Sequence, residues 1–291
     1  MTARYLDRVA ARSAATGTVL CLGLDPDPSA FPDGFSRDIA GVERFATLLV
    51  EAAVPFAAAV KPNLAFFEAF GSAGMAVLER LRAALPDDLP VIADAKRGDI
   101  GTTAARQATA LFDVLGADAV TVNPYLGSEA IRPLIERDDR FAYVLCRTSN
   151  PGAAEFQSLR VAPDPGTDAP DETLHERIAR HVARWGPGGT VGLVVGATAP
   201  EEMRAVRAVA PGLAFLVPGV GAQGGDIEPV LVAGPASRPP GAGRLGGGLL
   251  VNVSRGIADA AAEVSAGGPD DPFERVGRAA AEWARRLPVL P

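Results

Sequence analysis

The sequence predicts an α/β protein, an eight-stranded parallel (β/α) TIM barrel with an N-terminal helix covering the bottom. Three observations predict this fold class: eight short apolar runs, helix-like stretches between them, and a length of 291 residues that suits one large domain. The runs are apolar on both faces for most of their length, as buried parallel strands are. An open doubly wound sheet is the alternative, but no GxGxxG motif follows the first run.

The expected strands and helices alternate along the chain. Residues 1–15 precede the first strand and are expected to form the helix under the barrel. Ser36 and Ser128 are expected to be helix N-caps, and Pro200 suits a first helical turn. The strands are expected at 18–25, 56–63, 90–97, 119–125, 141–149, 190–198, 214–221 and 248–256, and the helices at 36–54, 75–85, 102–115, 128–136, 174–185, 200–210 and 272–286.

Two segments are longer than a minimal barrel needs. Residues 156–173 form a polar stretch with Pro and Asp after the fifth strand. Residues 234–248 carry six Gly and three Pro, a composition that buries too little apolar surface to order itself. This second segment is expected to be a floppy insertion or a mobile lid. The sequence therefore predicts one barrel domain over residues 1–291, with loop insertions near 156–173 and 234–248.

Composition excludes several classes of protein. The formal net charge is -7, whereas non-specific nucleic-acid binding needs a basic face. No apolar stretch reaches membrane-spanning length and no apolar signal core follows the N-terminus, so the expected location is the cytoplasm. Two cysteines and two histidines predict neither a disulfide framework nor a zinc site, and no metal is expected.

The chain has 28 basic residues, yet Lys61 and Lys96 are its only lysines. Arginine can replace lysine as a surface charge but not as a proton donor, because guanidinium stays protonated. Both lysines fall at predicted strand ends, where barrels of this type carry their reactive groups. Asp94 projects to the same side of its strand as Lys96, and Asp25 ends the first strand. This pattern favours lysines that have a function among carboxylates over lysines that remain on the surface by chance.

The last two strands indicate a phosphate site. The seventh runs into PGVGAQGG at 218–225, and the eighth ends in VSRG at 253–256. Backbone amides of glycine-rich turns in these positions commonly cradle phosphate, and Arg255 would add a permanently charged fork. Ordinary tight turns remain the alternative explanation for the glycines.

The run DAKRGDI at 94–100 resembles the DxKxxD(I) signature of the orotidine 5'-monophosphate decarboxylase family. Further matches follow in the family's order: Asp25-Pro26, KPN at 61–63, TSNPG at 148–152, the PGVGAQGG turn and SRG at 254–256. The runs CLGLDPDP, KPNLAFFE and VNPYLG are similar to the bacterial subfamily with the longer chain. The resemblance implies decarboxylation of orotidine 5'-monophosphate to uridine 5'-monophosphate and CO2 in pyrimidine nucleotide biosynthesis, without a cofactor.

The resemblance also implies catalytic roles. Lys96 would donate the proton to C6 of the pyrimidine, and Asp94 would face the substrate carboxylate. Asp99 would reach the neighbouring site across a dimer interface, where Thr103 would join it at the ribose. The expected assembly is a homodimer with shared active sites, and the expected partner is the nucleotide substrate alone.

The remaining implied roles concern binding. Asp25 and Lys61 would hold the ribose hydroxyls, with Lys61 also completing the catalytic charge network. Ser149 would bond the pyrimidine ring. Gln223, in a closing loop, and Arg255 would hold the phosphate.

Three alternatives stay open at this point. A sugar-phosphate aldolase would use Lys96 or Lys61 as a Schiff-base nucleophile, although neighbouring carboxylates disfavour the neutral amine that attack requires. A magnesium-dependent sugar-phosphate lyase on the same barrel would need clustered carboxylates around a metal, whereas here Asp alternates with Lys. A non-catalytic nucleotide-binding protein would bind uridine 5'-monophosphate without turning over the orotidine nucleotide.

Overall fold

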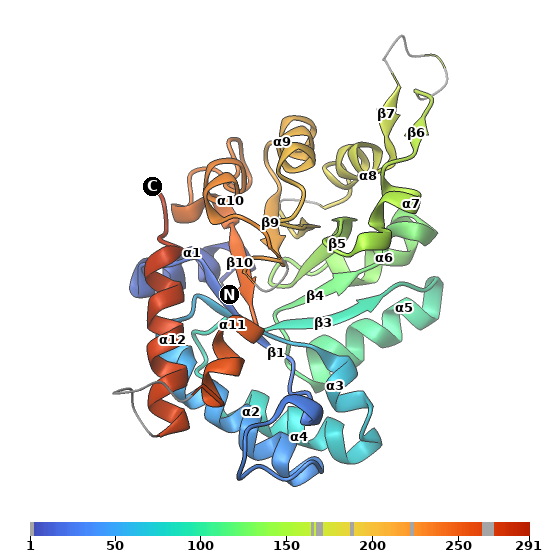
Figure 1. The fold of residues 1–291 in the computed structure, drawn as a ribbon. Coiled ribbons are helices and arrows are strands. Elements are labelled where there is room, and N and C mark those ends of the chain that lie inside the picture. Colours follow the sequence, from blue (N-terminus) through green and yellow to red (C-terminus); the bar gives the residue numbers. More distant parts are fainter. Residues whose placement is uncertain (1–2, 164–165, 167–170, 187–188, 222–223, 264–270) are drawn as a thin grey trace.

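The computed structural model describes residues 3–163, 166, 171–186, 189–221, 224–263 and 271–291, and its centre is a barrel of parallel strands (Figure 1). Hydrogen bonds join the eight strands in the order β2-β1-β10-β9-β8-β5-β4-β3. Single parallel bridges, Val60 to Val91 and Asn63 to Asp94, join the two ends of that order, so the barrel prediction is confirmed. The strands are β1 (Leu20–Leu24), β2 (Ala59–Pro62), β3 (Ile92–Arg97), β4 (Ala119–Val122), β5 (Phe141–Arg147), β8 (Val191–Val195), β9 (Ala214–Val217) and β10 (Leu250–Val253).

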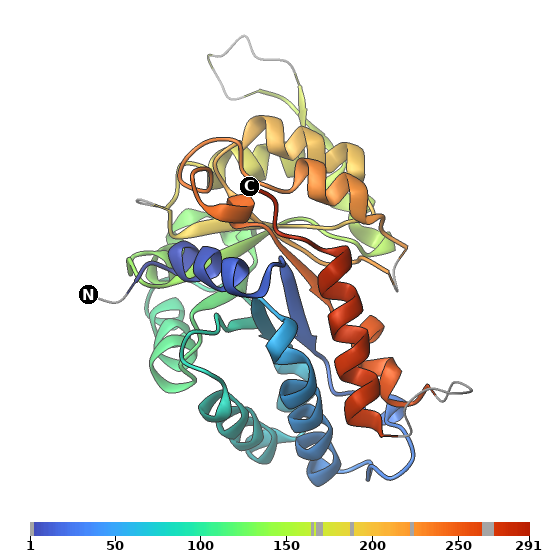
Figure 2. The ribbon, with the colours of Figure 1, turned by 90° about the vertical axis from the view of Figure 1, so that its left-hand side faces the viewer.

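Helices surround the barrel, and the last of them, α12, lies beside α2 (Figure 2). The helices are α1 (Tyr5–Thr16), α2 (Ile39–Ala53), α3 (Leu64–Glu68), α4 (Gly71–Ala84), α5 (Gly101–Ala108), α6 (Ser128–Ile135), α7 (Ala154–Gln157), α8 (Leu174–Val182), α9 (Pro200–Val209), α10 (Ile227–Ala233), α11 (Arg255–Ala258) and α12 (Pro272–Arg286). Short 3-10 or π segments are η1 (Pro28–Ala30), η2 (Val54–Phe56), η3 (Thr109–Val114), η4 (Pro124–Leu126), η5 (Pro151–Ala153), η6 (Leu245–Gly248) and η7 (Asp259–Ala261).

Two helices begin differently from the prediction. Asp38 caps α2, because its carboxylate accepts a hydrogen bond from the backbone of the first turn at 3.0 Å, and Ser36 lies outside the helix and donates to Asp38. Gly127, with φ +86°, precedes α6, and Ser128 is the first helical residue. The prediction that both serines are N-caps is therefore wrong. Pro200 begins α9, as predicted.

The N-terminal helix α1 closes the bottom of the barrel, as predicted. Its Tyr5, Leu6 and Val9 are buried in the apolar cluster that fills the barrel interior. The ring of Tyr5 stacks on Phe141 with 4.8 Å between the ring centroids. The floor of the barrel is thus dense and apolar. Nine further strand residues belong to it: Cys21, Ala59, Ile92, Ala119, Tyr143, Val194, Ala214, Leu216 and Leu250.

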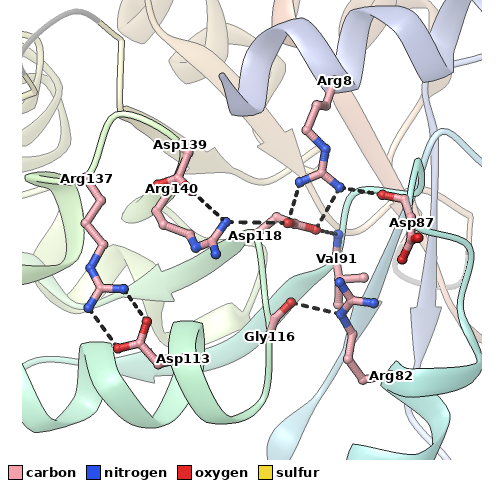
Figure 3. Close-up of polar contacts among 10 residues, drawn as sticks. All are labelled: Arg8, Arg82, Asp87, Val91, Asp113, Gly116, Asp118, Arg137, Asp139 and Arg140. Atoms are coloured by element: carbon pink, nitrogen blue, oxygen red, sulfur yellow. Dashed lines mark hydrogen bonds and ion pairs between the residues drawn. The ribbon is translucent and has the colours of Figure 1, made fainter. Parts of the chain in front are cut away.

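A buried carboxylate ties α1 to the strands (Figure 3). Asp118 precedes β4 and is 3% exposed. It accepts a hydrogen bond from the Arg8 guanidinium of α1 at 2.5 Å and one from the backbone N of Val91 at 2.8 Å. Arg140 adds a second cation 3.9 Å away. This cluster holds α1 against the start of the strands, opposite the end at which the reactive residues are expected.

The insertion at 156–173 contains a two-stranded antiparallel hairpin, β6 (Arg160–Val161) and β7 (Glu172–Thr173), which extends away from the barrel in Figure 1. Residues 164–165 and 167–170 lie outside the described part of the chain. Glu172 pairs with Arg177 and Arg180 of α8, so the base of the hairpin is fastened to that helix.

The glycine-rich segment 234–248 packs under the barrel. Its η6 contacts α1, and Gly246, Gly247 and Gly248 are buried. A Cβ at Gly248 would lie 2.8 Å from the Cβ of Ala214, so the segment is held by close backbone contact rather than by large apolar side chains. The expectation of a floppy insertion or mobile lid is therefore wrong, since the segment lies at the opposite end from the mouth of the barrel.

Candidate active site

The polar residues of the barrel interior lie one step above the apolar floor. Because strand side chains alternate, the inward position after Ala59 is Lys61, the one after Ile92 is Asp94, and the one after Ala119 is Thr121. These positions lie at the carboxyl ends of the strands, which form the mouth of the barrel. Two adjoining cavities of about 180 and 440 Å³ open there, and both are lined by Lys61, Asp94 and Pro218.

A carboxylate flanked by two ammonium groups occupies the centre of the mouth. Lys61 Nζ lies 2.5 Å from Asp94 Oδ2, and Lys96 Nζ lies 2.6 Å from Asp94 Oδ1. The side chains of Lys61 and Asp94 are 6% and 9% exposed, whereas that of Lys96 is 52% exposed. The Lys96 ammonium is therefore both anchored by Asp94 and accessible to a ligand in the larger cavity.

Opposite charges dominate the ionisation of this group. Burial lowers the pKa of Lys61, but the carboxylates of Asp94 and Asp25 outweigh burial and raise that pKa above its ordinary value. Burial likewise raises the pKa of Asp94, but Lys61 and Lys96 outweigh it and hold the pKa of this carboxyl well below its usual range. Lys61 and Asp94 are consequently an ion pair at neutral pH.

Two buried acceptors in the smaller cavity have no hydrogen-bond partner among the described residues. They are Asp25 Oδ1 and Asn252 Oδ1. Their strands approach closely at this point, since a Cβ at Gly23 would lie 1.8 Å from Ser254 Oγ. Buried acceptors of this kind are costly unless a donor reaches them, so they indicate the place of a ligand that carries hydroxyl or amine groups.

Glycine turns after β9 and β10 complete the smaller cavity. Pro218, Gly219 and Val220 line one side, and Ser254, Arg255 and Gly256 line the other. In the first turn, the backbone N of Gly225 donates a 3.1 Å hydrogen bond to the carbonyl of Gly219. Gly219 has φ +96°, a conformation that favours glycine.

Trp283 of α12 supports both turns from behind. Its Nε1 donates to the Gly256 carbonyl at 2.9 Å, and a Cβ at Gly221 would lie 2.8 Å from its ring. The backbone of the two turns is thereby held at the smaller cavity, which Arg255 also lines, a combination that suits an anion such as phosphate.

The larger cavity combines apolar walls with a polar loop. Leu145, Val194 and Leu216 line it together with residues 148–150 and Gln157. Gln157 accepts a hydrogen bond from the backbone N of Thr148 at 2.8 Å and donates to its hydroxyl at 2.8 Å. A Cβ at Gly196 would lie 2.9 Å from the Cβ of Ser149, so this glycine lets the loop approach the strand beside it. The dimensions and lining suit a flat ring with polar edges.

The structure brings most of the expected site residues together and leaves others apart. Asp25, Lys61, Asp94, Lys96, Ser149 and Arg255 line the two cavities. Asp99 and Thr103 do not line these cavities: Thr103 is exposed on α5, and Asp99 accepts a hydrogen bond from the backbone N of Ile100. Gln223 lies outside the described residues.

Sequence reasoning missed Thr121, Gln157, Asn252 and Trp283. Thr121 and Asn252 each stand at an inward position near a strand end, and that periodicity could have found them. Gln157 and Trp283 act through loop contacts that no local pattern reveals. Within the described ranges, no cluster of three His, Cys, Asp or Glu side chains is placed to hold a metal ion.

Fold and site together define an enzyme of the (β/α) barrel class whose mouth holds a carboxylate between two lysine ammonium groups. The sequence model of the orotidine 5'-phosphate decarboxylase / HUMPS family matches residues 18–268. This chain belongs to that family.

Named relatives are similar over most of the chain. An orotidine 5'-phosphate decarboxylase from Herpetosiphon aurantiacus is 43% identical over 254 residues, which are 87% of this chain and 88% of that protein. The crystal structure of a putative orotidine-monophosphate-decarboxylase from Toxoplasma gondii has a TM-score of 0.82 at 37% identity and covers 96% of this chain and 93% of that one. The structure of Leishmania donovani UMP synthase has a TM-score of 0.80 at 39% identity, and this chain spans 56% of its length.

No helix in the described part of the chain is long and apolar enough to span a membrane.

Proposed function

We propose that this chain decarboxylates orotidine 5'-monophosphate to uridine 5'-monophosphate and CO2, with Lys96 as the proton donor to C6. Family membership and the relatives' names support the reaction. One observation of this chain carries the residue assignment: the Asp94 carboxylate is shared between two ammonium groups at the mouth, one buried and one accessible.

The chemistry needs that arrangement. Loss of CO2 from C6 leaves an electron pair in the plane of the pyrimidine ring, where the ring cannot delocalise it. A fixed ammonium beside C6 stabilises the carbanion electrostatically and then protonates it. Asp94 holds the Lys96 ammonium in place and faces the substrate carboxylate.

Repulsion between Asp94 and the substrate carboxylate supplies only part of the lowering of the activation barrier. At about 4 Å and an effective dielectric of about 20, two like charges repel by about 4 kcal/mol. Enzymes commonly lower barriers by about 8–23 kcal/mol. Repulsion alone is therefore too small to account for the lowered barrier, and stabilisation of the carbanion by Lys96 supplies a further large part.

The two cavities suit the two ends of the nucleotide. In the smaller one, the unpartnered Asp25 Oδ1 and Lys61 would hold the ribose hydroxyls, with Asn252 as an additional acceptor. Arg255 and the glycine turns would bind the phosphate, with Gln223 completing that site. The pyrimidine would enter the larger cavity and bond Ser149.

A homodimer would complete the site. Asp99 and Thr103 do not line this chain's own two cavities, and three large apolar side chains that follow β3 and β4 are exposed: Ile100 is 56%, Tyr125 91% and Leu126 46% exposed. Exposed large apolar side chains are compatible with burial in an interface. In the dimer, Asp99 and Thr103 would reach the ribose in the neighbouring site.

The aldolase alternative is disfavoured by charge. A Schiff base forms from the neutral amine, and the carboxylates around Lys61 raise its pKa. The relatives from Herpetosiphon aurantiacus and Toxoplasma gondii carry the decarboxylase name, and neither the aldolase nor the magnesium-dependent lyase draws support from them.

The direct test follows absorbance during loss of orotidine 5'-monophosphate, with and without EDTA. We expect equal turnover in both conditions, none in Lys96→Ala, and retained binding of uridine 5'-monophosphate by that variant. Turnover by Lys96→Ala would remove the proposed proton donor, and loss of wild-type turnover in EDTA would favour the metal-dependent alternative.

The shared site has its own test. Asp99→Ala and Lys96→Ala are each expected to be inactive as homodimers. Mixing the two after dissociation should restore part of the activity, because one of the two sites in a mixed dimer then contains both residues. A mixture that contains mixed dimers and stays inactive would contradict the shared site.

A further inference from the structure

The strand that carries the catalytic residues is irregular at the point where it meets β4. Ala93 of β3 lies opposite Val120, and Arg97 lies opposite Val122. Three residues of β3 therefore face a single residue of β4, which is Thr121. A bulge of this kind breaks the regular hydrogen-bond ladder and redirects side chains, and bulges are common next to active sites.

The hydroxyl of Thr121 replaces the missing ladder contacts. Thr121 Oγ1 accepts hydrogen bonds from the backbone N of Ala95 and of Lys96, each at 3.0 Å. It donates to Asp94 Oδ1 at 2.8 Å. A hydroxyl offers one donor and two lone pairs, so Thr121 uses its full capacity on this short segment. The side chain is buried, with 2% exposure.

The conformation of Lys96 depends on such support. Lys96 has φ +46°, and it is the one non-glycine residue with positive φ in the described part of the chain. This left-handed conformation is unfavourable for a residue with a Cβ, and it persists where neighbouring contacts enforce it. The contact to the Lys96 backbone N and the contact to Asp94 both come from the Thr121 hydroxyl.

We propose that Thr121 is a positioning residue for the reaction. Its hydroxyl holds the β3 bulge and fixes the Asp94 carboxylate, so that one oxygen faces Lys61 and the other faces Lys96. Thr121 does not itself reach the reacting atoms. The inference rests on the proposed function, because it assigns Thr121 to the presentation of the Lys96 ammonium toward C6.

The test compares variants that differ in the hydroxyl alone. Thr121→Val keeps the branched shape and removes the hydroxyl, and it is expected to lower kcat by about 100-fold, the typical effect of a small displacement of a catalytic group. KM should change by less than about threefold, since the groups that bind ribose and phosphate are untouched. Thr121→Ser restores the hydroxyl and should recover kcat to within about tenfold of the wild type.

Thr190→Val is the matched control. Thr190 is also buried and precedes β8 at the bottom of the barrel, where its hydroxyl donates to the Ile135 carbonyl at 2.7 Å. Its kcat should equal that of the wild type. Should Thr121→Val fail to fold, Thr121→Cys provides a second measurement, because a thiol is a weak donor and acceptor. Its kcat should fall below that of Thr121→Ser.

The outcomes separate this inference from the proposed function. Wild-type turnover together with full kcat in Thr121→Val or Thr121→Cys would overturn the role of Thr121. Absence of wild-type turnover would overturn the proposed function instead. In that case a crystal structure of the Thr121 variant still decides the positioning claim: Lys96 should leave its left-handed conformation and its contact with Asp94, and an unchanged contact would refute the claim.

Discussion

The carboxylate under the barrel allows stability and activity to be tested separately. Asp118→Ala removes the partner of Arg8 and leaves the backbone N of Val91 without its acceptor (Figure 3). Removing one partner of a buried ion pair costs about 3–5 kcal/mol. Arg8 is 16% exposed, so we take the lower end of that range, and the unsatisfied backbone N adds about 1 kcal/mol.

The expected loss is therefore about 4 kcal/mol of unfolding free energy. For a domain of nearly 300 residues, each kcal/mol lowers Tm by roughly 2 °C, so Tm should fall by roughly 8 °C. Circular dichroism during heating measures this change. Asp118→Asn should lose less, because its amide oxygen can still accept from the backbone N of Val91.

Asp113→Ala is the control for burial. Asp113 pairs with Arg137 in the same region of Figure 3, but these side chains are 47% and 38% exposed. Exposed ion pairs contribute little, so Tm should fall far less than in Asp118→Ala. Equal falls in Tm for both variants would refute the reasoning from burial. At assay temperatures well below Tm, both variants should have the kcat of the wild type. A loss of kcat in folded Asp118→Ala would show that the floor and the mouth of the barrel are coupled.

Three further predictions concern the mouth. Arg255→Ala should raise KM by about 10- to 100-fold, as expected for loss of one charged hydrogen bond, and an unchanged KM would exclude Arg255 from the phosphate site. Borohydride added with a phosphorylated sugar should trap no adduct on Lys61, since its raised pKa keeps the amine protonated; a labelled Lys61 peptide in mass spectrometry would contradict this. The pKa of Asp94 lies below its ordinary value of 3.8, and the pKa of Lys61 lies above its ordinary value of 10.5. The stability that their pairing contributes should therefore be constant between pH 3.8 and pH 10.5. It should be lost as pH falls through the folded-state pKa of Asp94 and as pH rises through the folded-state pKa of Lys61. The difference in Tm between wild type and Asp94→Asn measures this, and a marked change between about pH 5 and pH 9 would conflict with the ion pair.

The strands and the charged centre could be predicted because their signals are local. Each barrel strand lies within an expected apolar run, and α12 has the expected bounds of 272–286. Asp94 and Lys96 meet as predicted, although the bulge in β3 interrupts the alternation on which that prediction was based. The hairpin within 156–173 and the packing of 234–248 could not be predicted in this way. The first pairs short polar strands, and the second is ordered by backbone contacts that glycine permits, which composition alone reads as disorder.

By itself, the sequence determined the kind of fold and the kinds of chemical group at its mouth. Apolar periodicity encodes strands and helices, and the rarity of lysine identified Lys61 and Lys96 as candidates. The tertiary structure alone decided which atoms meet: Asp94 bridges two lysines, Thr121 supports the bulge, and Trp283 backs two glycine turns. These contacts join residues from different strands and helices. They depend on the register of neighbouring strands and the closure of the barrel, which no local pattern in the chain specifies.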